Sequence, residues 1–329
     1  MLRGKTFAIT GATGRLGCET TARLEELGAD VLPLVLDGYP KQPKRVNWTA
    51  QQEPIIIAEA DDLKNIKAPD YVIHFHWLVD RSLTYKDQLQ FELDYGLHRI
   101  FYFLNWLKEV SCRRFVNISS TKVFSHLNPN PISAESDPRP MTPYGLAKLT
   151  AERFLDAYFY SSNVPVIHVR LCSVASYGEH PTQILSQFCQ SAYGNKAIKV
   201  NTGHSMNLLY IDEAVDLIIN AALKANKFRY ILATPSMAVD EIAARFEKIS
   251  GKKLNAEYVD LNPGGTDPAF ESDIELLSVR WIRKTSLDSM ILRMIEQYLS
   301  DSAASDDLEP TFHFKDTDHR TYHGNKASV

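Results

Sequence analysis

Short apolar runs alternate with amphipathic segments along roughly the first 175 residues of the chain. The apolar runs have strand length and end at glycine, proline or charged residues, whereas the segments between them carry apolar residues at helical spacing. The predicted strands are KTFAIT, DVLPLVLDG, EPIIIAEADDL, PDYVIHFHWL, RRFVNISS and VPVIHVRLCSV. This alternation predicts an α/β fold, a Rossmann-type doubly wound parallel sheet with helices on both faces.

The helices expected between these strands are CETTARLEELGA, which Gly28 ends, QFELDYGLHRIFYFLNWLKEV, and residues 144–161. Beyond about residue 175 the alternation loosens. There we expect a strand in FRYILAT, a strand followed by a helix in MNLLYIDEAVDLIINAALKA, and helices in PTQILSQFCQSAYG, VDEIAARFEKISG and LDSMILRMIEQYLS. Gly251 is expected to end the second of these last three helices. This part of the chain predicts a smaller C-terminal α/β domain.

Three glycines, Gly11, Gly14 and Gly17, follow the first strand and open the first helix in TGATGRLG. Glycine is needed where a dinucleotide pyrophosphate approaches the backbone at a helix N-terminus. The next strand ends in Asp37, 20 residues beyond Gly17, the spacing at which a carboxylate meets the adenosine ribose. A carboxylate repels a 2'-phosphate, so the pattern predicts NAD and makes NADP the less favoured cofactor. Arg15, which could contact a phosphate, is the residue that favours NADP.

A tyrosine and a lysine stand four positions apart in TPYGLAKLTAERF, which spans residues 142–154. Tyr144 and Lys148 lie on one face of the predicted helix, and simple packing of the lysine stem on the ring would explain the spacing. Alternatively, the lysine charge lowers the pKa of the phenol, so that the tyrosine exchanges protons near neutral pH. The spacing alone leaves both interpretations open.

Composition mainly excludes functions. The chain of 329 residues has 44% hydrophobic residues and a formal net charge of -4, which gives no reason to expect nucleic acid or a membrane as a partner. No apolar run reaches the roughly 18 residues of a membrane helix, and the first residues do not follow a signal-peptide pattern. Cys18, Cys112, Cys172 and Cys189 show no paired spacing, so neither disulfides nor a zinc site are expected. A cytoplasmic location follows as an expectation.

The segments TGATGRLG, ISSTKVF and YGLAK, in that order, resemble the extended short-chain dehydrogenase/reductase superfamily. The resemblance is to its NAD-dependent epimerase/dehydratase branch, which acts on nucleotide sugars, and covers roughly residues 3–300. We expect an NAD-binding Rossmann domain over residues 1–172, to which residues 206–235 return. An interleaved substrate-binding domain is expected over residues 173–300, and a polar tail over residues 301–329.

The resemblance implies roles for individual residues. Tyr144 would be the catalytic acid/base, Lys148 would lower its pKa and bind the nicotinamide ribose, and Ser120 would hydrogen-bond the reacting oxygen. Either Glu59 or Asp61 would meet the adenine amine. The cofactor contacts implied are Gly11, Thr13, Gly14, Arg15, Leu16, Gly17, Asp37, Phe75, His76, Lys148 and Ser173.

The sequence departs from the family pattern at three places. Thr121 and Lys122 follow Ser120, where 4,6-dehydratases carry a carboxylic acid, and this disfavours dehydration. Met206 stands where nucleotide-sugar enzymes often place an arginine for the diphosphate, so Lys196, Lys199 or Arg280 would have to serve. Gly96 stands where a helix asparagine is usual. These departures indicate an uncommon substrate.

Other residues have weaker assignments. His74 and His76 point to one side of a strand, but the pattern offers no third ligand, so no metal is expected. Lys122, His180 and Arg280 are candidate substrate contacts. The aromatic segments FYFLNWL and FLDAYFY would serve either the core or, as the resemblance implies, a helix bundle between the subunits of a homodimer.

Three functional hypotheses follow. The first is an NAD-dependent nucleotide-sugar epimerase or 4-ketoreductase, for which Ser120, Tyr144 and Lys148 serve hydride and proton transfer. The second is an NAD(P)-dependent reductase or dehydrogenase of a non-nucleotide carbonyl compound, which the missing arginine favours. The third is a non-catalytic NAD-binding protein, against which the intact Ser-Tyr-Lys set argues.

Overall fold

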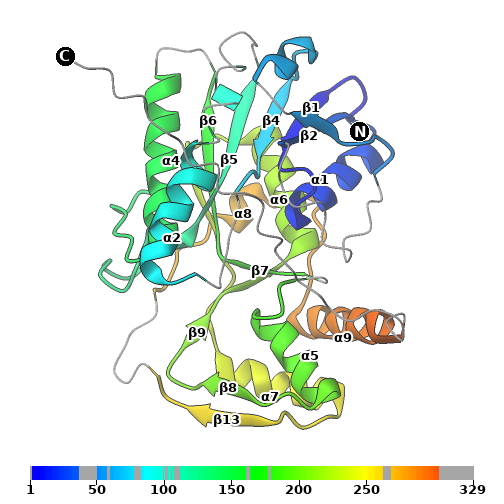
Figure 1. Cartoon of the computed structure of the whole chain (residues 1–329), viewed down its shortest axis with the longest axis vertical. Helices are drawn as coiled ribbons and strands as arrows, with labels where there is room; N and C mark the ends of the chain where they lie inside the picture. Colours follow the sequence, from blue (N-terminus) through cyan, green and yellow to red (C-terminus); the bar gives the residue numbers. More distant parts are fainter. Residues whose placement is uncertain are drawn as a thin grey trace, which may run out of the picture.

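The computed structural model describes residues 2–36, 50–57, 60–77, 83–98, 100, 103–104, 106, 112–160, 164–176, 179–261 and 268–303. Seven parallel strands form one sheet in the order β11-β6-β5-β4-β1-β2-β3 (Figure 1). They are β1 (Thr6–Thr10), β2 (Asp30–Leu36), β3 (Ile55–Ile57), β4 (Tyr71–His74), β5 (Arg114–Ser120), β6 (Val166–Leu171) and β11 (Arg229–Leu232). The predicted parallel sheet is confirmed. Its strand order reverses between β1 and β4, and ligands bind beyond the carboxyl ends of the strands at such a point.

Helices cover both faces of this sheet (Figure 1). One face carries α1 (Arg15–Glu26) and α6 (Ile211–Lys224), and the other carries α4 (Pro143–Phe159), α2 (Tyr85–Phe91) and the π-helical turn η2 (Glu92–Leu97). Phe115 and Val116, which are neighbours in β5, belong to two different apolar cores. This follows from the strand period of two, which sends successive side chains to opposite faces.

The remaining elements form a lower lobe and the connecting turns. The two-stranded sheets pair β7 (Ser173–Ala175) with β10 (Leu208–Tyr210), β9 (Ser205–Met206) with β12 (Met237–Ala238), and β8 (Ile198–Asn201) with β13 (Ala256–Val259). The helices are α5 (Ile184–Gly194), α7 (Val239–Ser250), α8 (Ile274–Leu277) and α9 (Leu287–Ala303), and the 3-10 turns are η1 (Ala60–Asn65) and η3 (Thr121–Val123). Figure 1 shows α5, α7 and α9 with β8 and β13 below the large sheet.

The sequence locates most element ends but not all. Gly28 and Gly251 have positive φ angles of 81° and 65° directly after α1 and α7, as their stop positions require. The helix expected from residue 90 onward is different, because α2 ends at Phe91 and a π-helical turn follows it. The sequence did not indicate β8 and β13, which are four residues each and pair across a long stretch of chain.

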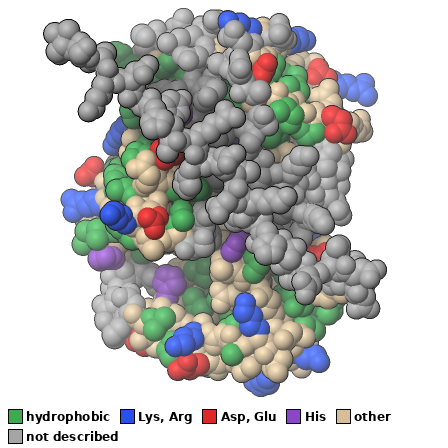
Figure 2. All heavy atoms as spheres, viewed as in Figure 1, with side chains coloured by type: hydrophobic (Ala, Val, Ile, Leu, Met, Phe, Trp, Pro, Cys, Tyr) green, Lys and Arg blue, Asp and Glu red, His purple; other side chains and the backbone are tan. Residues whose placement is uncertain are grey.

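The described surface mixes charges of both signs. Figure 2 shows Lys and Arg side chains interspersed with Asp and Glu on this face of the lower lobe. In the part of the chain that the structure describes, none of the helices has the length and apolar character needed to cross a membrane.

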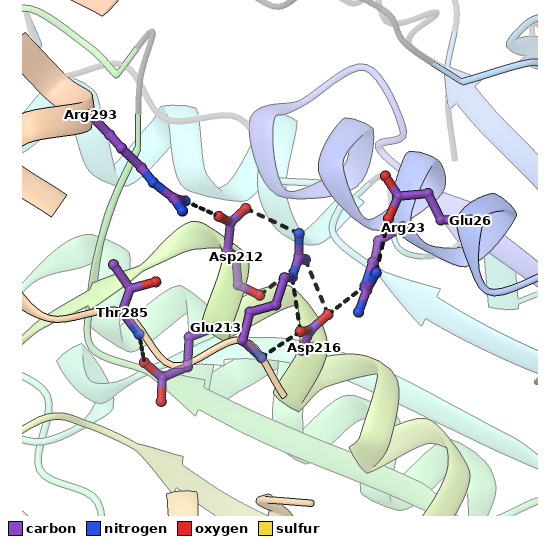
Figure 3. A network of polar contacts seen from close by, with 8 residues as sticks. Arg23, Glu26, Asp212, Glu213, Asp216, Thr285 and Arg293 are labelled. Carbon is purple, nitrogen blue, oxygen red and sulfur yellow. Dashed lines mark hydrogen bonds and ion pairs between the residues drawn. The ribbon is translucent and has the colours of Figure 1, made fainter. Parts of the chain in front are cut away.

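A buried carboxylate ties α1, α6 and the segment before α9 together (Figure 3). Asp216 on α6 is fully buried and accepts hydrogen bonds from the Arg23 Nε at 2.9 Å and the Arg283 Nε at 2.9 Å. The backbone N–H of Arg283 also donates to it, at 2.8 Å. A buried charge is stable only when it is paired and hydrogen-bonded in this way. The network therefore fixes the segment that leads from the sheet into α9.

We expect Asp216→Ala to lower the free energy of unfolding by roughly 2–4 kcal/mol, because it leaves two arginines of the network without their buried partner. Urea denaturation followed by circular dichroism measures this loss. Asp288→Ala is the matched control, since it breaks an exposed bidentate pair with Arg245 and should cost much less, because water screens an exposed ion pair. Equal losses in the two variants would contradict the assigned role of Asp216.

Candidate active site

The glycine-rich turn between β1 and α1 packs against the end of β4. Gly11 has a φ of 68°, and a Cβ atom there would lie 2.9 Å from the backbone N and Cα of His76. A Cβ atom at Gly17 would lie 2.3 Å from the carbonyl oxygen of Gly11. The Phe75 N–H donates to the Thr10 carbonyl at 3.1 Å and so holds the end of β4 beside the turn. Glycine is required at both positions because a side chain would collide with backbone.

The start of α1 is suited to an anionic ligand. Among the described residues, no side chain caps this helix at Gly14, and its first turn carries no acid. The first N–H groups of a helix lack partners within the helix and lie at the positive end of its dipole. Thr13 and Leu16 are half-buried beside them. This cradle fits the pyrophosphate of a dinucleotide.

The predicted adenosine contacts are Asp37 and either Glu59 or Asp61. Asp37 and Glu59 lie outside the described residues, and so does the side chain of Asp61.

Arg15 points toward the segment that follows β7. Its Nη1 donates to the Ser176 Oγ at 2.6 Å. Glu179 lies close enough for the charge of Arg15 to act on it, and burial raises the pKa of the Glu179 carboxyl in spite of that charge. The Glu179 carboxylate also accepts from the backbone N–H of Ser186 at 3.1 Å. Arg15 thus links α1 to the loop before α5 and has an acid beside it.

Helix α4 begins beside the turn that follows β5. Thr142 caps the helix by accepting a hydrogen bond from the Gly145 N–H at 3.0 Å, and Pro143 occupies the first turn, where its missing N–H costs nothing. A Cβ atom at Gly145 would lie 2.1 Å from the carbonyl oxygen of Lys122. This close approach sets the start of α4, including Tyr144, against the turn that Ser120 caps by accepting the Lys122 N–H at 3.1 Å.

Lys148 is buried one turn further along α4. The residue is only 5% exposed, and its Nζ donates to the Ile118 carbonyl at 2.9 Å. The Nζ lies 5.8 Å from the centroid of the Tyr144 ring. Burial lowers the pKa of Lys148 to about 7, although the charges of Glu92 and Glu152 raise it. A lysine that titrates near neutral pH beside a tyrosine fits the acid/base interpretation of the sequence.

Trp77 and Glu92 complete the surroundings of this lysine. The Trp77 ring centroid lies 3.9 Å from the Lys148 Nζ, and the indole meets the Tyr144 ring edge to face at 6.4 Å. The indole Nε1 donates to the Glu92 Oε2 at 2.8 Å. A Cβ atom at Gly96 would lie 2.6 Å from the Trp77 ring. Gly96, the residue in place of the usual asparagine, thus makes room for the indole.

The two histidines of HFHW occupy an aromatic core. His74 Nδ1 is 2.8 Å from the Thr10 Oγ1, and its ring contacts Phe103 and Phe115. Burial, helped by the nearby positive charges, holds the pKa of His74 well below its ordinary value. Among the described side chains, no group of three or more His, Cys, Asp or Glu is placed to hold a metal ion.

The residues predicted to contact substrate are spread over the surface. The side chain of Lys122 is exposed, and Arg280 is exposed after α8. Ser173, which was predicted to contact the cofactor, is exposed at the start of β7. His180 is also exposed, and its Nδ1 lies 2.8 Å from the Thr182 Oγ1.

Two of the three alternative diphosphate ligands, Lys196 and Lys199, have partners of their own. The Lys196 Nζ donates to the Gln190 Oε1 at 2.8 Å, and Lys199 lies 3.6 Å from Glu257 on the neighbouring strand. The start of α4 and the turn after β5 bring Ser120, Tyr144 and Lys148 together, and the substrate contacts are proposals.

Sequence reasoning missed Trp77, Glu92 and Gly145. The signal for Gly145 was present, because a glycine at the third position of a helix, just after the N-cap Thr142, indicates close approach of backbone. Trp77 and Glu92 gave no local signal, since their meeting depends on how the end of β4 and the π-helical turn fold toward α4.

We expect Lys148→Met to raise the free energy of unfolding at pH 6 by a few kcal/mol, on the order of 3. The folded-state pKa of Lys148, about 7, lies below the ordinary value of 10.5, so the unfolded chain binds more protons between these values. The cost of burying the ammonium is therefore complete below pH 7 and disappears as the pH rises toward 10.5. The advantage of the variant should vanish over the same interval.

Urea unfolding at a series of pH values tests this, with Lys67→Met as the control for an exposed lysine. A Lys148→Met protein less stable than the parent at pH 6 would show that the ammonium is well solvated.

Comparisons with known proteins agree with this geometry. The chain is 23% identical over 317 residues to an Arabidopsis thaliana protein, RHM3, named as a trifunctional UDP-glucose 4,6-dehydratase, UDP-4-keto-6-deoxy-D-glucose 3,5-epimerase and UDP-4-keto-L-rhamnose-reductase. That match covers 89% of this chain and 47% of the relative. The chain spans about half the length, or less, of the first curated relatives it matches.

Solved structures show the same fold. A UDP-glucose-4-epimerase from Stenotrophomonas maltophila with bound NAD and formylated UDP-arabinopyranose has a TM-score of 0.76 at 19% identity, covering 91% of this chain and 99% of that one. MoeE5 in complex with UDP-glucuronic acid and NAD has a TM-score of 0.72 at 20% identity, covering 91% of this chain and 100% of that one.

The family model described as the NAD dependent epimerase/dehydratase family matches residues 7–231, from β1 through β11, and this is more than half of the chain. The match includes the glycine turn, Ser120 and the start of α4. The chain therefore belongs to the NAD-dependent epimerase/dehydratase family, as its sequence motifs indicated.

Proposed function

We propose that this chain is an NAD-dependent nucleotide-sugar epimerase or 4-ketoreductase. One observation carries the proposal: the glycine turn at the start of α1 and the Ser120, Tyr144 and Lys148 set both lie at the carboxyl edge of the parallel sheet, the first directly after β1 and the second beside the end of β5. Structural neighbours that bind NAD together with UDP-sugars support the same choice of ligands.

In the proposed reaction the nicotinamide, when bound, supplies and accepts the hydride. Tyr144 takes a proton from the sugar hydroxyl on oxidation and returns one on reduction. Ser120 hydrogen-bonds the oxygen that changes between hydroxyl and carbonyl. Lys148 supports the phenolate by its charge, and because its pKa is about 7 that charge is present at and below neutral pH. An epimerase uses both halves of this cycle, whereas a ketoreductase uses one.

We propose NAD as the cofactor, with NADP less favoured. Arg15, the residue that favours a 2'-phosphate, is held at Ser176 beside the acid Glu179. The contact of Asp37 with the adenosine ribose remains part of the proposal.

Dehydration is disfavoured by the residues after Ser120. Several curated relatives are named as 4,6-dehydratases, including the mouse dTDP-D-glucose 4,6-dehydratase, which is 22% identical. In this chain Thr121 is buried and Lys122 is exposed, and neither is a carboxylic acid. We therefore propose the redox half of the family chemistry without elimination of water.

We also propose that the chain forms a homodimer through α2 and α4. Phe103 and Trp106, from the first aromatic segment, pack inside the core of one chain. Leu89 on α2, Leu93 on the adjoining turn η2 and Phe154 on α4 are exposed, at 43%, 48% and 47%. An apolar helix surface of this kind favours a symmetric helix bundle between two copies.

A different observation bears on each of the two alternative hypotheses. Met206 at the diphosphate position favours a carbonyl substrate without a nucleotide. A non-catalytic NAD-binding protein would have no need to bury the ammonium of Lys148 beside Tyr144.

The cofactor site predicts that Gly17→Ala weakens NADH binding at least tenfold, because the new Cβ atom must displace the Gly11 carbonyl from the turn. Energy transfer from tryptophan to NADH measures the dissociation constant. Gly194→Ala is the control, since its Cβ atom meets only the hydroxyl end of Tyr298. Unchanged NADH affinity in Gly17→Ala would place the cofactor elsewhere.

The catalytic site predicts that Tyr144→Phe lowers turnover at least about 100-fold, because proton transfer loses its acid/base, while NADH binds within about threefold of the parent. Turnover is followed by NMR on a panel of UDP- and dTDP-linked hexoses and their 4-keto forms. Tyr85→Phe, at an exposed tyrosine, is the control. Full turnover by Tyr144→Phe would remove the tyrosine from the mechanism.

A further inference from the structure

Glu92 stands out among the buried acids of the protein. Glu92 is 1% exposed and lies in the π-helical turn η2, which follows α2. Its Oε2 accepts the Trp77 indole N–H at 2.8 Å, while its Oε1 has no hydrogen-bond partner among the described residues. Burying a carboxylate with one oxygen unsatisfied costs free energy, so this arrangement needs a compensating charge.

Lys148 is the charge that Glu92 faces. The Trp77 indole contacts both groups, with its ring 3.9 Å from the Lys148 Nζ and its N–H on the Glu92 carboxylate. Burial raises the pKa of Glu92, and the Trp77 hydrogen bond and the Lys148 charge oppose that rise. The interaction is reciprocal, because the charge of Glu92 also supports the protonated form of Lys148.

The other charged groups around Lys148 come from its own helix and from β4. Glu152, one turn further along α4, is committed to Arg170, which donates to its two oxygens at 3.0 and 2.8 Å. Tyr144 faces Lys148 from the preceding turn. His74, at the end of β4, feels positive charge from Lys148 and from His76 and is driven toward its neutral form. Glu92 is thus the acid near Lys148 whose charge no arginine of the described residues balances.

We propose that Glu92 is a positioning residue of the active site, which keeps the Lys148 ammonium charged and fixed through the Trp77 indole that contacts both. The inference rests on the proposed function, since it assigns Glu92 to the lysine that would support Tyr144 and bind the nicotinamide ribose. The π-helical turn places this carboxylate, and Gly96 in the same turn leaves room for the indole. π-Helical turns are frequent at functional sites.

The first test needs no cofactor. Urea unfolding from pH 5 to 10 is measured for the parent, Glu92→Gln, Lys148→Met and the double variant. The difference in free energy of unfolding between each protein and its Lys148→Met counterpart reports the cost of burying the Lys148 ammonium. As the pH rises, this difference begins to fall at the folded-state pKa of Lys148. In the parent background that point is expected near pH 7. With Glu92→Gln it should move down by about one pH unit, a tenfold loss of proton affinity.

Asp94→Asn is the matched control. Asp94 lies in the same π-helical turn, is exposed, and binds the Gln90 side chain. Asp94→Asn should therefore leave the pH at which Lys148 titrates unchanged. An unmoved titration in Glu92→Gln overturns the proposal. If Glu92→Gln alone fails to fold, the double variant should recover a cooperative transition, because it also removes the charge left without its counter-ion. A double variant that stays unfolded shows a merely structural role and overturns the proposal as well.

The second readout separates this inference from the proposed function. NADH affinity is measured over the same pH range for the parent, Glu92→Gln and Glu92→Asp. The pH at which binding weakens should shift down in Glu92→Gln by the amount seen in unfolding and return toward the parent value in Glu92→Asp, which keeps the charge. Equal weakening at every pH would contradict a role through Lys148. A parent protein that does not bind NADH at any pH would refute the proposed function, while the unfolding cycle would still decide the role of Glu92.

Discussion

The candidate site depends on keeping one lysine ammonium out of water. Lys148 lies at the carboxyl end of the sheet, where it donates to the Ile118 carbonyl and lies against the face of Trp77. Water would solvate the ammonium better than these groups do. Burial of Lys148, the residue proposed to support Tyr144, therefore destabilises the folded protein. Functional sites commonly store destabilisation of this kind, and the surrounding fold must compensate for it.

The compensation comes from the start and the middle of α4 and the elements that face them. Further along the helix, Arg170 on β6 binds Glu152 with two hydrogen bonds in a fully buried pair, which fixes α4 against the sheet. At its start, the Thr142 cap and the absence of a side chain at Gly145 set the helix against the turn after β5. Tyr144 and Lys148 are therefore held by rigid elements, as proton transfer at a defined distance requires.

The motifs that the sequence revealed are those built from neighbouring residues. The glycine turn, the hydroxyl end of β5 and the spacing of Tyr144 and Lys148 are local, so periodicity and spacing predicted the sheet, the cradle and the pair. Glu92 and Trp77 reach Lys148 from two other elements, and only the folded chain shows that they meet. The π-helical turn was equally hidden, because its residues have the same amphipathic pattern as an α-helix.

Substrate recognition was the least predictable part. Lys122 and His180 were chosen because the resemblance places them near the substrate, and Arg280 as a substitute for the missing diphosphate arginine. The structure shows all three exposed. Exposed side chains are positioned by a ligand as much as by the fold, so spacing along the sequence carries little information about them. Met206 in place of arginine remains the clearest indication that the diphosphate contact, and with it the substrate, differs from the common one.

The most direct test of the account is to denature freshly purified protein and identify the small molecules it releases by mass spectrometry. We expect NAD in a near one-to-one amount, and a nucleotide sugar released with it would identify the substrate class. Released NADPH would contradict the cofactor assignment. A protein that releases nothing and binds neither NAD nor NADH when they are supplied would contradict the central claim that the glycine turn and the Tyr144–Lys148 pair form one cofactor-dependent site.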